Sequence, residues 1–160
     1  MKTLISLAFV ALMSLPLSAQ VRVAVLPIRN MDGNLLLNKY CYAIADSLRA
    51  ALTTNAQNGK QFYILPSDSV EAVLAELNLD PNNPQYESDV WKSVAKLNCQ
   101  YAITGSFNVN GGRMLLNVYT YRVATKMADQ TNAAKNIFKA PERILEMIGI
   151  IRDRLLPGLM

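Results

Sequence analysis

Serine hydroxyls are the groups in this sequence best suited to covalent chemistry, and each would need a base beside it. Ser67, Ser69 and Ser106 are candidate nucleophiles, but a hydroxyl is weakly nucleophilic until a neighbouring group takes its proton. The 160 residues include no histidine, which excludes a Ser-His-Asp triad and a Cys-His pair. The base would have to be a lysine such as Lys60 or Lys126, and the sequence places neither of them against a serine.

Metal and phosphate sites lack their usual patterns as well. The absence of histidine excludes every His-based metal site. The segment 30–34, Asn-Met-Asp-Gly-Asn, has oxygen ligands but lacks the spaced acids of a calcium loop, so it predicts a turn. Ser67 beside Asp68 is typical of the start of a helix. We therefore expect no catalytic residue, no metal ligand and no cofactor-binding residue, and hence no cofactor.

The first nineteen residues have the layout of a secretory signal peptide. Lys2 precedes an apolar run from Leu4 to Leu15, Pro16 follows, and Ala19 ends an acceptable cleavage site. As a helix, this apolar run covers about 18 Å, against roughly 30 Å for the hydrocarbon core of a bilayer. We predict cleavage after Ala19, no stable membrane span afterwards, and a periplasmic location.

Charge and cysteine content narrow the range of partners. The chain has 16 basic and 12 acidic residues. The basic residues are scattered along the sequence, whereas a nucleic-acid site needs a patch or stripe, so we expect no nucleic-acid partner. Cys41 and Cys99 could form a disulfide in an oxidising compartment. Cys41 also falls on the apolar face of a predicted helix, where a free thiol behaves as a small hydrophobe, and both interpretations stay open.

Hydrophobic periodicity predicts a mixed α/β (α+β) fold. The run VRVAVLPI at 21–28 is typical of a strand covered on both faces, and later segments alternate with period 3.6 or period 2. Strands are expected at 21–28, 61–65, 100–109, 113–123 and within 126–138, and helices at 37–52, 70–77, 88–98 and 141–155. Residues 110–112, Asn-Gly-Gly, predict a hairpin turn. We expect one domain over 20–160, ordered β-α-β-α-α-β-β-β-α, with a mixed sheet of about five strands and helices mainly on one face.

The strand predicted at 113–123 carries the most promising surface. Its alternating positions form two sets that face opposite sides of a sheet: Met114, Leu116, Val118 and Thr120, and Leu115, Asn117, Tyr119 and Tyr121. If the first set packs against helices, then Asn117, Tyr119 and Tyr121 form a candidate partner-binding face, because tyrosine combines apolar area with a polar tip. The alternative is that neighbouring strands and the C-terminal helix cover these side chains.

Four segments resemble the N-terminal domain of TolB and its relatives. They are VRVAVLPIRNMDGN at 21–34, AIADSLRAAL at 43–52, FYILPSDSVEAVLAEL at 62–77 and VAKLNCQYAITGSFNVNGGRMLLNVYTYRV at 94–123. The relatives include the curli-secretion CsgG family, the FlgO family and the lipoprotein activators of penicillin-binding proteins. This sequence departs from them in three ways. No lipid-acceptor cysteine follows the leader, no propeller follows the domain, and residues 124–127 read Ala-Thr-Lys-Met where relatives often have a Thr-Gly-Glu turn.

The resemblance implies a TolB-N-like fold with a non-catalytic role in the cell envelope. We expect a periplasmic protein-binding domain that acts in secretion, envelope assembly or the regulation of cell-wall synthesis, with an envelope protein as its partner. Docking would use the tyrosine face or an exposed sheet edge. Two alternatives remain. One is a subunit of an outer-membrane, curli-secretion-like export complex, which would be a homo-oligomer. The other is a small hydrolase that uses Ser or Asp with Lys.

Overall fold

The computed structural model describes residues 20–160, and the predicted signal peptide lies outside the described residues. The strands are β1 (Val21–Val25), β2 (Arg29–Asn30), β3 (Phe62–Ile64), β4 (Tyr101–Asn110), β5 (Arg113–Arg122), β6 (Met127–Ala128) and β7 (Ala134–Lys139). The α-helices are α1 (Lys39–Thr53), α2 (Ser67–Glu76), α3 (Tyr86–Lys96) and α4 (Ile148–Leu155). Three 3₁₀ helices are η1 (Leu35–Leu37), η2 (Pro141–Met147) and η3 (Leu156–Leu159).

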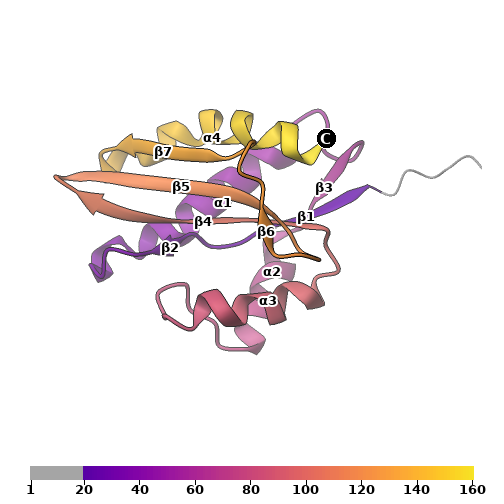
Figure 1. Ribbon diagram of the computed structural model, residues 1–160, viewed down its shortest axis with the longest axis horizontal. Coiled ribbons are helices and arrows are strands. Elements are labelled where there is room, and N and C mark those ends of the chain that lie inside the picture. The colour runs from indigo at the N-terminus through magenta and orange to yellow at the C-terminus, as the bar shows by residue number, and fades with distance from the viewer. Residues whose placement is uncertain (1–19) are drawn as a thin grey trace, which may run out of the picture.

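The strands form one mixed sheet in the order β3-β1-β4-β5-β6, with β2 also beside β4 and β7 beside β5 (Figure 1). β1 runs parallel to both β3 and β4, whereas β4 and β5 pair antiparallel along their whole length. Gly111 and Gly112 join β4 to β5 with φ values of 57° and 74°, a left-handed backbone that glycine adopts readily. The predicted mixed α/β fold and its hairpin are therefore confirmed.

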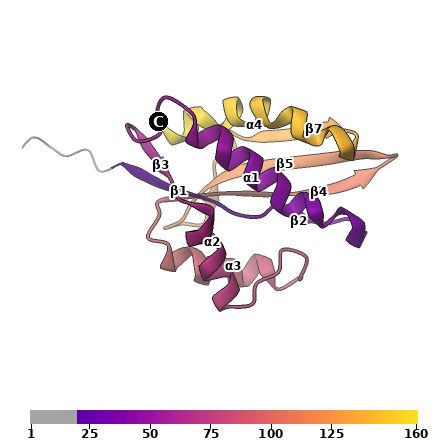
Figure 2. The same cartoon turned by 180° about the vertical axis from the view of Figure 1, so that it is seen from behind.

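Alternating side chains of β1 divide the core into two clusters on opposite faces of the sheet. Val23 and Val25 belong to the larger cluster, which includes residues of α1 and α4. Ala24 belongs to the smaller cluster, with residues of α2 and α3. Figures 1 and 2 show α1 and α4 on one side and α2 and α3 on the other. The expectation of helices mainly on one face needs this correction: both faces of β1 are apolar, and each requires its own cover.

The covered face of β5 is the one predicted from its alternation. Met114, Leu116, Val118 and Thr120 are buried in this strand. Leu115, Asn117, Tyr119 and Tyr121 alternate with them and are only half-buried. Part of the second face of the β4–β5 hairpin therefore lies open, beside α3.

The C-terminal third differs in detail from the expectation. The segment 126–138 supplies two short strands, β6 and β7, so that the sheet has seven strands instead of about five. Asn136 in β7 has a φ of 57°, and the pairing of β7 with β5 is irregular beside it. The helix predicted at 141–155 begins as the 3₁₀ helix η2 and becomes α-helical only at Ile148.

The start of α2 and the lengths of the helices are the last two features of the fold. Pro66 is the N-cap of α2, and no side chain caps that helix, so the helix-start role predicted for Ser67 is not a capping hydrogen bond. Within residues 20–160, no helix is both long enough and apolar enough to cross a membrane.

Candidate functional site

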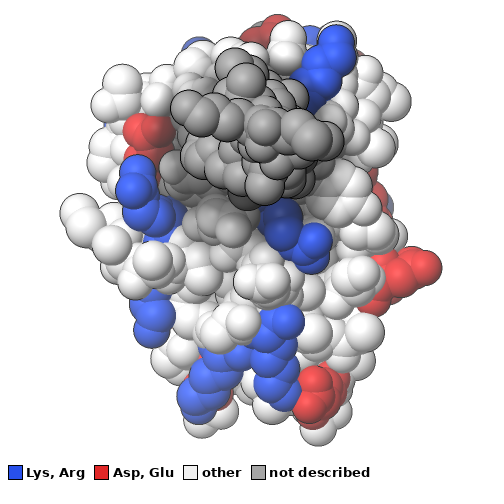
Figure 3. All heavy atoms as spheres, turned by 90° about the vertical axis from the view of Figure 1, so that its right-hand side faces the viewer, with Lys and Arg blue, Asp and Glu red and all other residues white. Residues whose placement is uncertain are grey.

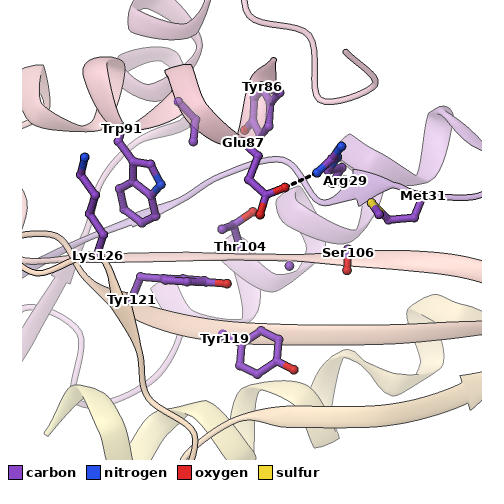
Figure 4. A pocket seen from close by; sticks show the side chains of 12 residues that line it. Arg29, Met31, Tyr86, Glu87, Trp91, Thr104, Ser106, Tyr119, Tyr121 and Lys126 are labelled. Atoms are coloured by element: carbon purple, nitrogen blue, oxygen red, sulfur yellow. Dashed lines mark hydrogen bonds and ion pairs between the residues drawn. The ribbon is translucent and has the colours of Figure 1, made fainter. Parts of the chain in front are cut away.

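A groove of about 310 Å³ lies between α3 and the open face of the β4–β5 hairpin. Its walls and floor include side chains from α3, β4 and β5, shown in Figure 4. We call it the aromatic groove and define it by Glu87, Trp91, Thr104, Ser106, Tyr119 and Tyr121. A groove of this size is at the lower end of the range for ligand sites.

Three aromatic rings form a continuous series along this groove. The rings of Trp91 and Tyr121 meet edge to face with their centroids 5.5 Å apart. Tyr119 meets Tyr121 in the same manner at 6.2 Å. Such pairs are worth about 0.5–1.5 kcal/mol beyond the burial of their area. The rings therefore hold one another in place while keeping part of their surface open.

The hydroxyl of Tyr121 remains protonated at neutral pH. Burial raises the pKa of Tyr121, and the nearby Tyr119 and Glu87 raise it further. A protonated phenol can donate one hydrogen bond and accept others. The groove thus offers apolar ring faces together with a neutral polar group.

The floor of the groove is fixed by contacts to neighbouring backbone. Thr104 donates a hydrogen bond from Oγ1 to the carbonyl oxygen of Pro27, over 2.9 Å. A Cβ at Gly105 would collide with the backbone carbonyl of Asn117 on β5, so no side chain would fit there. These contacts hold β4 against both the end of β1 and the strand that carries the tyrosines.

Charged groups lie at the two ends of the groove. At one end, Arg29 after β1 forms an ion pair with Glu87 on α3, which joins the sheet to the helix (Figure 4). At the other end is Lys126, whose ammonium group forms no ion pair with any residue of 20–160. The second end therefore retains an uncompensated positive charge.

The predicted partner-binding residues divide into two groups. Tyr119 and Tyr121 line the groove, as the tyrosine hypothesis requires. Asn117 does not line it, and its Oδ1 accepts a hydrogen bond from the backbone N–H of Asn136 over 2.9 Å. Asn117 therefore connects β5 to β7, and its partner-binding role stays a prediction.

Most of the other groove residues carry no binding signal in the sequence. Arg29, Trp91, Thr104 and Lys126 line the groove, and the sequence pattern assigns none of them to a binding surface. A tryptophan next to the buried position Val90 was the one available signal. The rest come together only through the packing of α3 against the sheet.

Ser106 and Lys126, two of the groups considered for catalysis, do not form a catalytic pair. Ser106 and Lys126 both line the groove, but Figure 4 shows them toward opposite ends, and no hydrogen bond joins them in the described chain. Ser67 lies in the first turn of α2, outside the groove. Among residues 20–160, no cluster of three or more Cys, Asp or Glu side chains has the arrangement of a metal site.

Cys41 and Cys99 are buried free thiols in this structure. Cys41 belongs to the cluster beneath α1 and α4, and Cys99 to the cluster beneath α2 and α3. Because the sheet separates these clusters, the disulfide considered from the sequence is not formed here. Of the two interpretations left open, the structure has the two buried thiols.

The visible basic residues do not form a continuous stripe. Figure 3 views the end of the molecule that lies on the right in Figure 1, and it shows lysine and arginine at several separate places. A nucleic-acid interface would gather such residues into a patch. The distribution on this face gives no support to a nucleic-acid partner.

Comparison with known proteins establishes the fold but not a family. Neither a protein-family model nor a curated protein sequence matches this chain. The LpoB C-terminal domain from Salmonella enterica is similar in structure, with a TM-score of 0.52 and 18% identity over 72% of this chain and 79% of that chain. The same domain from Escherichia coli has a TM-score of 0.51 and 18% identity over 78% and 86% of the two chains.

A second kind of neighbour has a still lower identity. Lipoprotein GNA1162 from Neisseria meningitidis has a TM-score of 0.56 and 10% identity, covering 88% of this chain and 99% of that chain. This chain therefore has a fold that also occurs in lipoprotein GNA1162 and in the LpoB C-terminal domain. The CsgG-like and FlgO-like assignments stay predictions.

Proposed function

We propose that this chain is a non-catalytic periplasmic domain whose aromatic groove binds an envelope protein. The observation that carries the proposal is the series Trp91–Tyr121–Tyr119, half-open on a sheet face beside α3. Tryptophan and tyrosine are enriched where protein interfaces concentrate their binding energy. A rigid series of three such rings suits the docking of a partner's apolar side chain.

The polar groups of the groove support binding over chemistry. Thr104 is engaged with the backbone of Pro27, and Glu87 is paired with Arg29. These contacts fix the shape of the groove and leave the ring faces and Lys126 available to a partner. The groove would therefore recognise an apolar segment that carries a negative charge near Lys126.

The envelope role rests on the resemblance and on the fold. The sequence resembles TolB-like proteins and the lipoprotein activators of penicillin-binding proteins, and the fold is similar to those of LpoB and GNA1162. We infer that the domain acts in the envelope. Among the roles that the resemblance implies, regulation of cell-wall synthesis by a protein–protein contact receives the most support.

Capture of the partner in living cells tests this proposal. A photo-crosslinking residue placed at Ser106, on the floor of the groove, should yield a specific adduct that mass spectrometry identifies. Tyr119→Ala with Tyr121→Ala, combined with that probe, should reduce the yield about tenfold or more, since two anchor rings are lost. Loss of the two ring pairs should lower the free energy of unfolding by about 1–3 kcal/mol, in addition to the effect of the apolar area that the truncated rings no longer bury.

A matched control uses two exposed tyrosines elsewhere. Tyr42 on α1 and Tyr63 on β3 are both exposed and lie outside the groove. Tyr42→Ala with Tyr63→Ala should leave the adduct unchanged. Equal capture by the groove variant and the control variant would contradict the proposed function.

A further inference from the structure

An exposed apolar surface lies next to the aromatic groove. Met31, Leu35 and Leu36 are 54%, 74% and 82% exposed, and the two leucines are the most exposed large hydrophobic residues of the described chain. Single exposed leucines are ordinary, whereas exposed apolar residues that form one contiguous patch are typical of interaction sites. We call these three residues the apolar knob.

Hydrogen bonds hold the loop that presents the knob. The Oδ1 of Asn30 accepts from the backbone N–H of Asp32, and the Nδ2 of Asn30 donates to the carbonyl of Asn34, each over 3.0 Å. Oδ1 of Asn34 accepts from the N–H of Leu36, and Oδ2 of Asp32 accepts from the N–H of Val109, also over 3.0 Å. Because the loop is ordered in advance, binding through its leucines loses little conformational entropy.

The knob and the groove are adjacent parts of one surface. Met31 belongs to the knob and also lines the groove, at the end opposite Lys126 (Figure 4). An apolar projection beside an apolar hollow is self-complementary when a second copy is turned by a two-fold rotation. Closed two-fold dimers built from one such patch are the commonest homo-oligomers.

The charges of the two features are also complementary. Asp32 is the acidic residue of the knob loop, and one of its carboxylate oxygens, Oδ1, accepts no hydrogen bond from residues 20–160. Lys126 is the cation of the groove that has no ion pair within that range. When the leucines of one copy lie in the groove of a second copy, Asp32 of the first copy can approach Lys126 at the end of the second copy's groove.

We propose that the occupant of the groove in the free protein is the apolar knob of a second copy, in a two-fold dimer. Each copy then contributes Leu35 and Leu36 to the groove of the other. The groove is small, about 310 Å³, so the dimer should be weak and should dissociate on dilution. This inference goes beyond the proposed function, and it implies that dimerisation and partner binding compete for the same groove.

Sedimentation velocity of the purified protein over a range of concentrations tests the dimer. The wild type should shift from monomer to dimer as its concentration rises. Leu35→Ser with Leu36→Ser should weaken association about a hundredfold, because two buried leucines are lost from each contact. Leu145→Ser with Ile150→Ser is the matched control, since both residues are exposed elsewhere, on η2 and α4, and it should dimerise as the wild type does. A wild-type monomer at every concentration would overturn the inference.

Mixing two defective variants identifies the contact. The knob variant retains an intact groove, and Tyr119→Ala with Tyr121→Ala retains an intact knob. Each variant alone should be monomeric, and an equal mixture should form heterodimers through the one knob–groove contact that both can complete. The heterodimer keeps one of the two contacts and should be weaker than the wild-type dimer, so the mixture is compared with each variant alone at the highest concentrations. A mixture that associates no more than either variant alone would place the dimer contact elsewhere and overturn the inference.

The knob variant also separates this inference from the proposed function. It should still give the Ser106 adduct with the envelope partner, because its groove is unchanged. Dimerisation without partner capture would contradict the proposed function alone, and capture by a strictly monomeric protein would contradict the inference alone. Lys126→Glu should weaken the dimer more than Lys126→Arg does. Equal effects of the two substitutions would show that Lys126 makes no charge contact in the interface.

Discussion

Gly105 on β4 lies so close to β5 that a Cβ built at this position would be 1.9 Å from the carbonyl oxygen of Asn117. No real Cβ tolerates that distance, so the two backbones can approach only because residue 105 has no side chain. The contact is in the middle of the long hairpin, at the floor of the aromatic groove. The shape of the groove floor therefore depends on the glycine at position 105.

Gly105→Ala should strongly destabilise the protein. The added methyl group forces β4 and β5 apart at a central pair of the hairpin, and the loss should exceed about 3 kcal/mol, the upper end of the usual range for a single substitution. Urea unfolding followed by circular dichroism measures the loss. Gly149→Ala is the matched control, because nothing lies within 4 Å of a Cβ there, and in a helix it should add up to about 1 kcal/mol of stability. Equal effects of the two substitutions would contradict the packing argument.

The hairpin could be predicted because its signals are local. Period-two alternation continues from Met114 to Tyr121, and the turn residues lie between the strands. The groove could not be predicted in the same way. Trp91 and Tyr121 are far apart in the sequence, and their contact depends on how α3 packs on the sheet.

The sequence of β1 already indicated that helices would cover both faces of the sheet, although the expected fold placed them mainly on one face. The run at 21–28 is apolar at successive positions, and it was interpreted as a strand covered on both faces. That interpretation conflicts with helices mainly on one face, and the structure agrees with the strand: Val23 and Ala24 are both fully buried, in different clusters. The local pattern of β1 was the better guide.

The two thiols should be unreactive in the folded protein. Burial raises the pKa of Cys41 to about 11, and burial also raises the pKa of Cys99. Near pH 8 both are protonated and shielded, whereas the thiolate is the reactive form. Iodoacetamide should label neither cysteine in the native protein and both in denaturant without a reductant. Failure to label the denatured protein until a reductant is added would reveal a disulfide and contradict the structure.

Asp129 should make stability depend on pH in the acid range. Its pKa is lowered, first because its carboxylate accepts a hydrogen bond from the backbone N–H of Asn132 over 3.0 Å, and then through the Asn132 side chain at 2.8 Å. A lowered pKa in the folded state gives stability that is present above the unfolded pKa, about 3.9. That stability is lost as the pH falls through the folded pKa.

Asp129→Asn removes the titration but keeps an oxygen that can accept hydrogen bonds. The stability of the variant should fall less steeply than that of the wild type between about pH 4 and pH 2. Denaturant unfolding at a series of pH values measures both slopes. Parallel curves for the two proteins would show that Asp129 does not contribute to the acid dependence.

Arg49 should stabilise the end of β1 through one buried hydrogen bond. Its side chain is 10% exposed, and its Nη2 donates to the carbonyl oxygen of Val25 over 2.7 Å. Arg49→Met would keep much of the apolar stem but leave that carbonyl without its donor, at an expected loss of about 1–3 kcal/mol. Chemical denaturation of the variant measures the effect.

The ion pair between Arg49 and Asp46 provides the control for that prediction. Asp46 is 58% exposed and accepts from Nη1 of Arg49 over 2.5 Å, so Asp46→Asn should change stability by less than about 1 kcal/mol. The Val25 carbonyl lies just before Pro27, whose own carbonyl accepts from Thr104 in the groove floor. Arg49→Met should therefore also loosen the groove and lower the Ser106 crosslinking yield. An equal loss of stability in both variants would assign the effect to the ion pair and leave the end of β1 without this support.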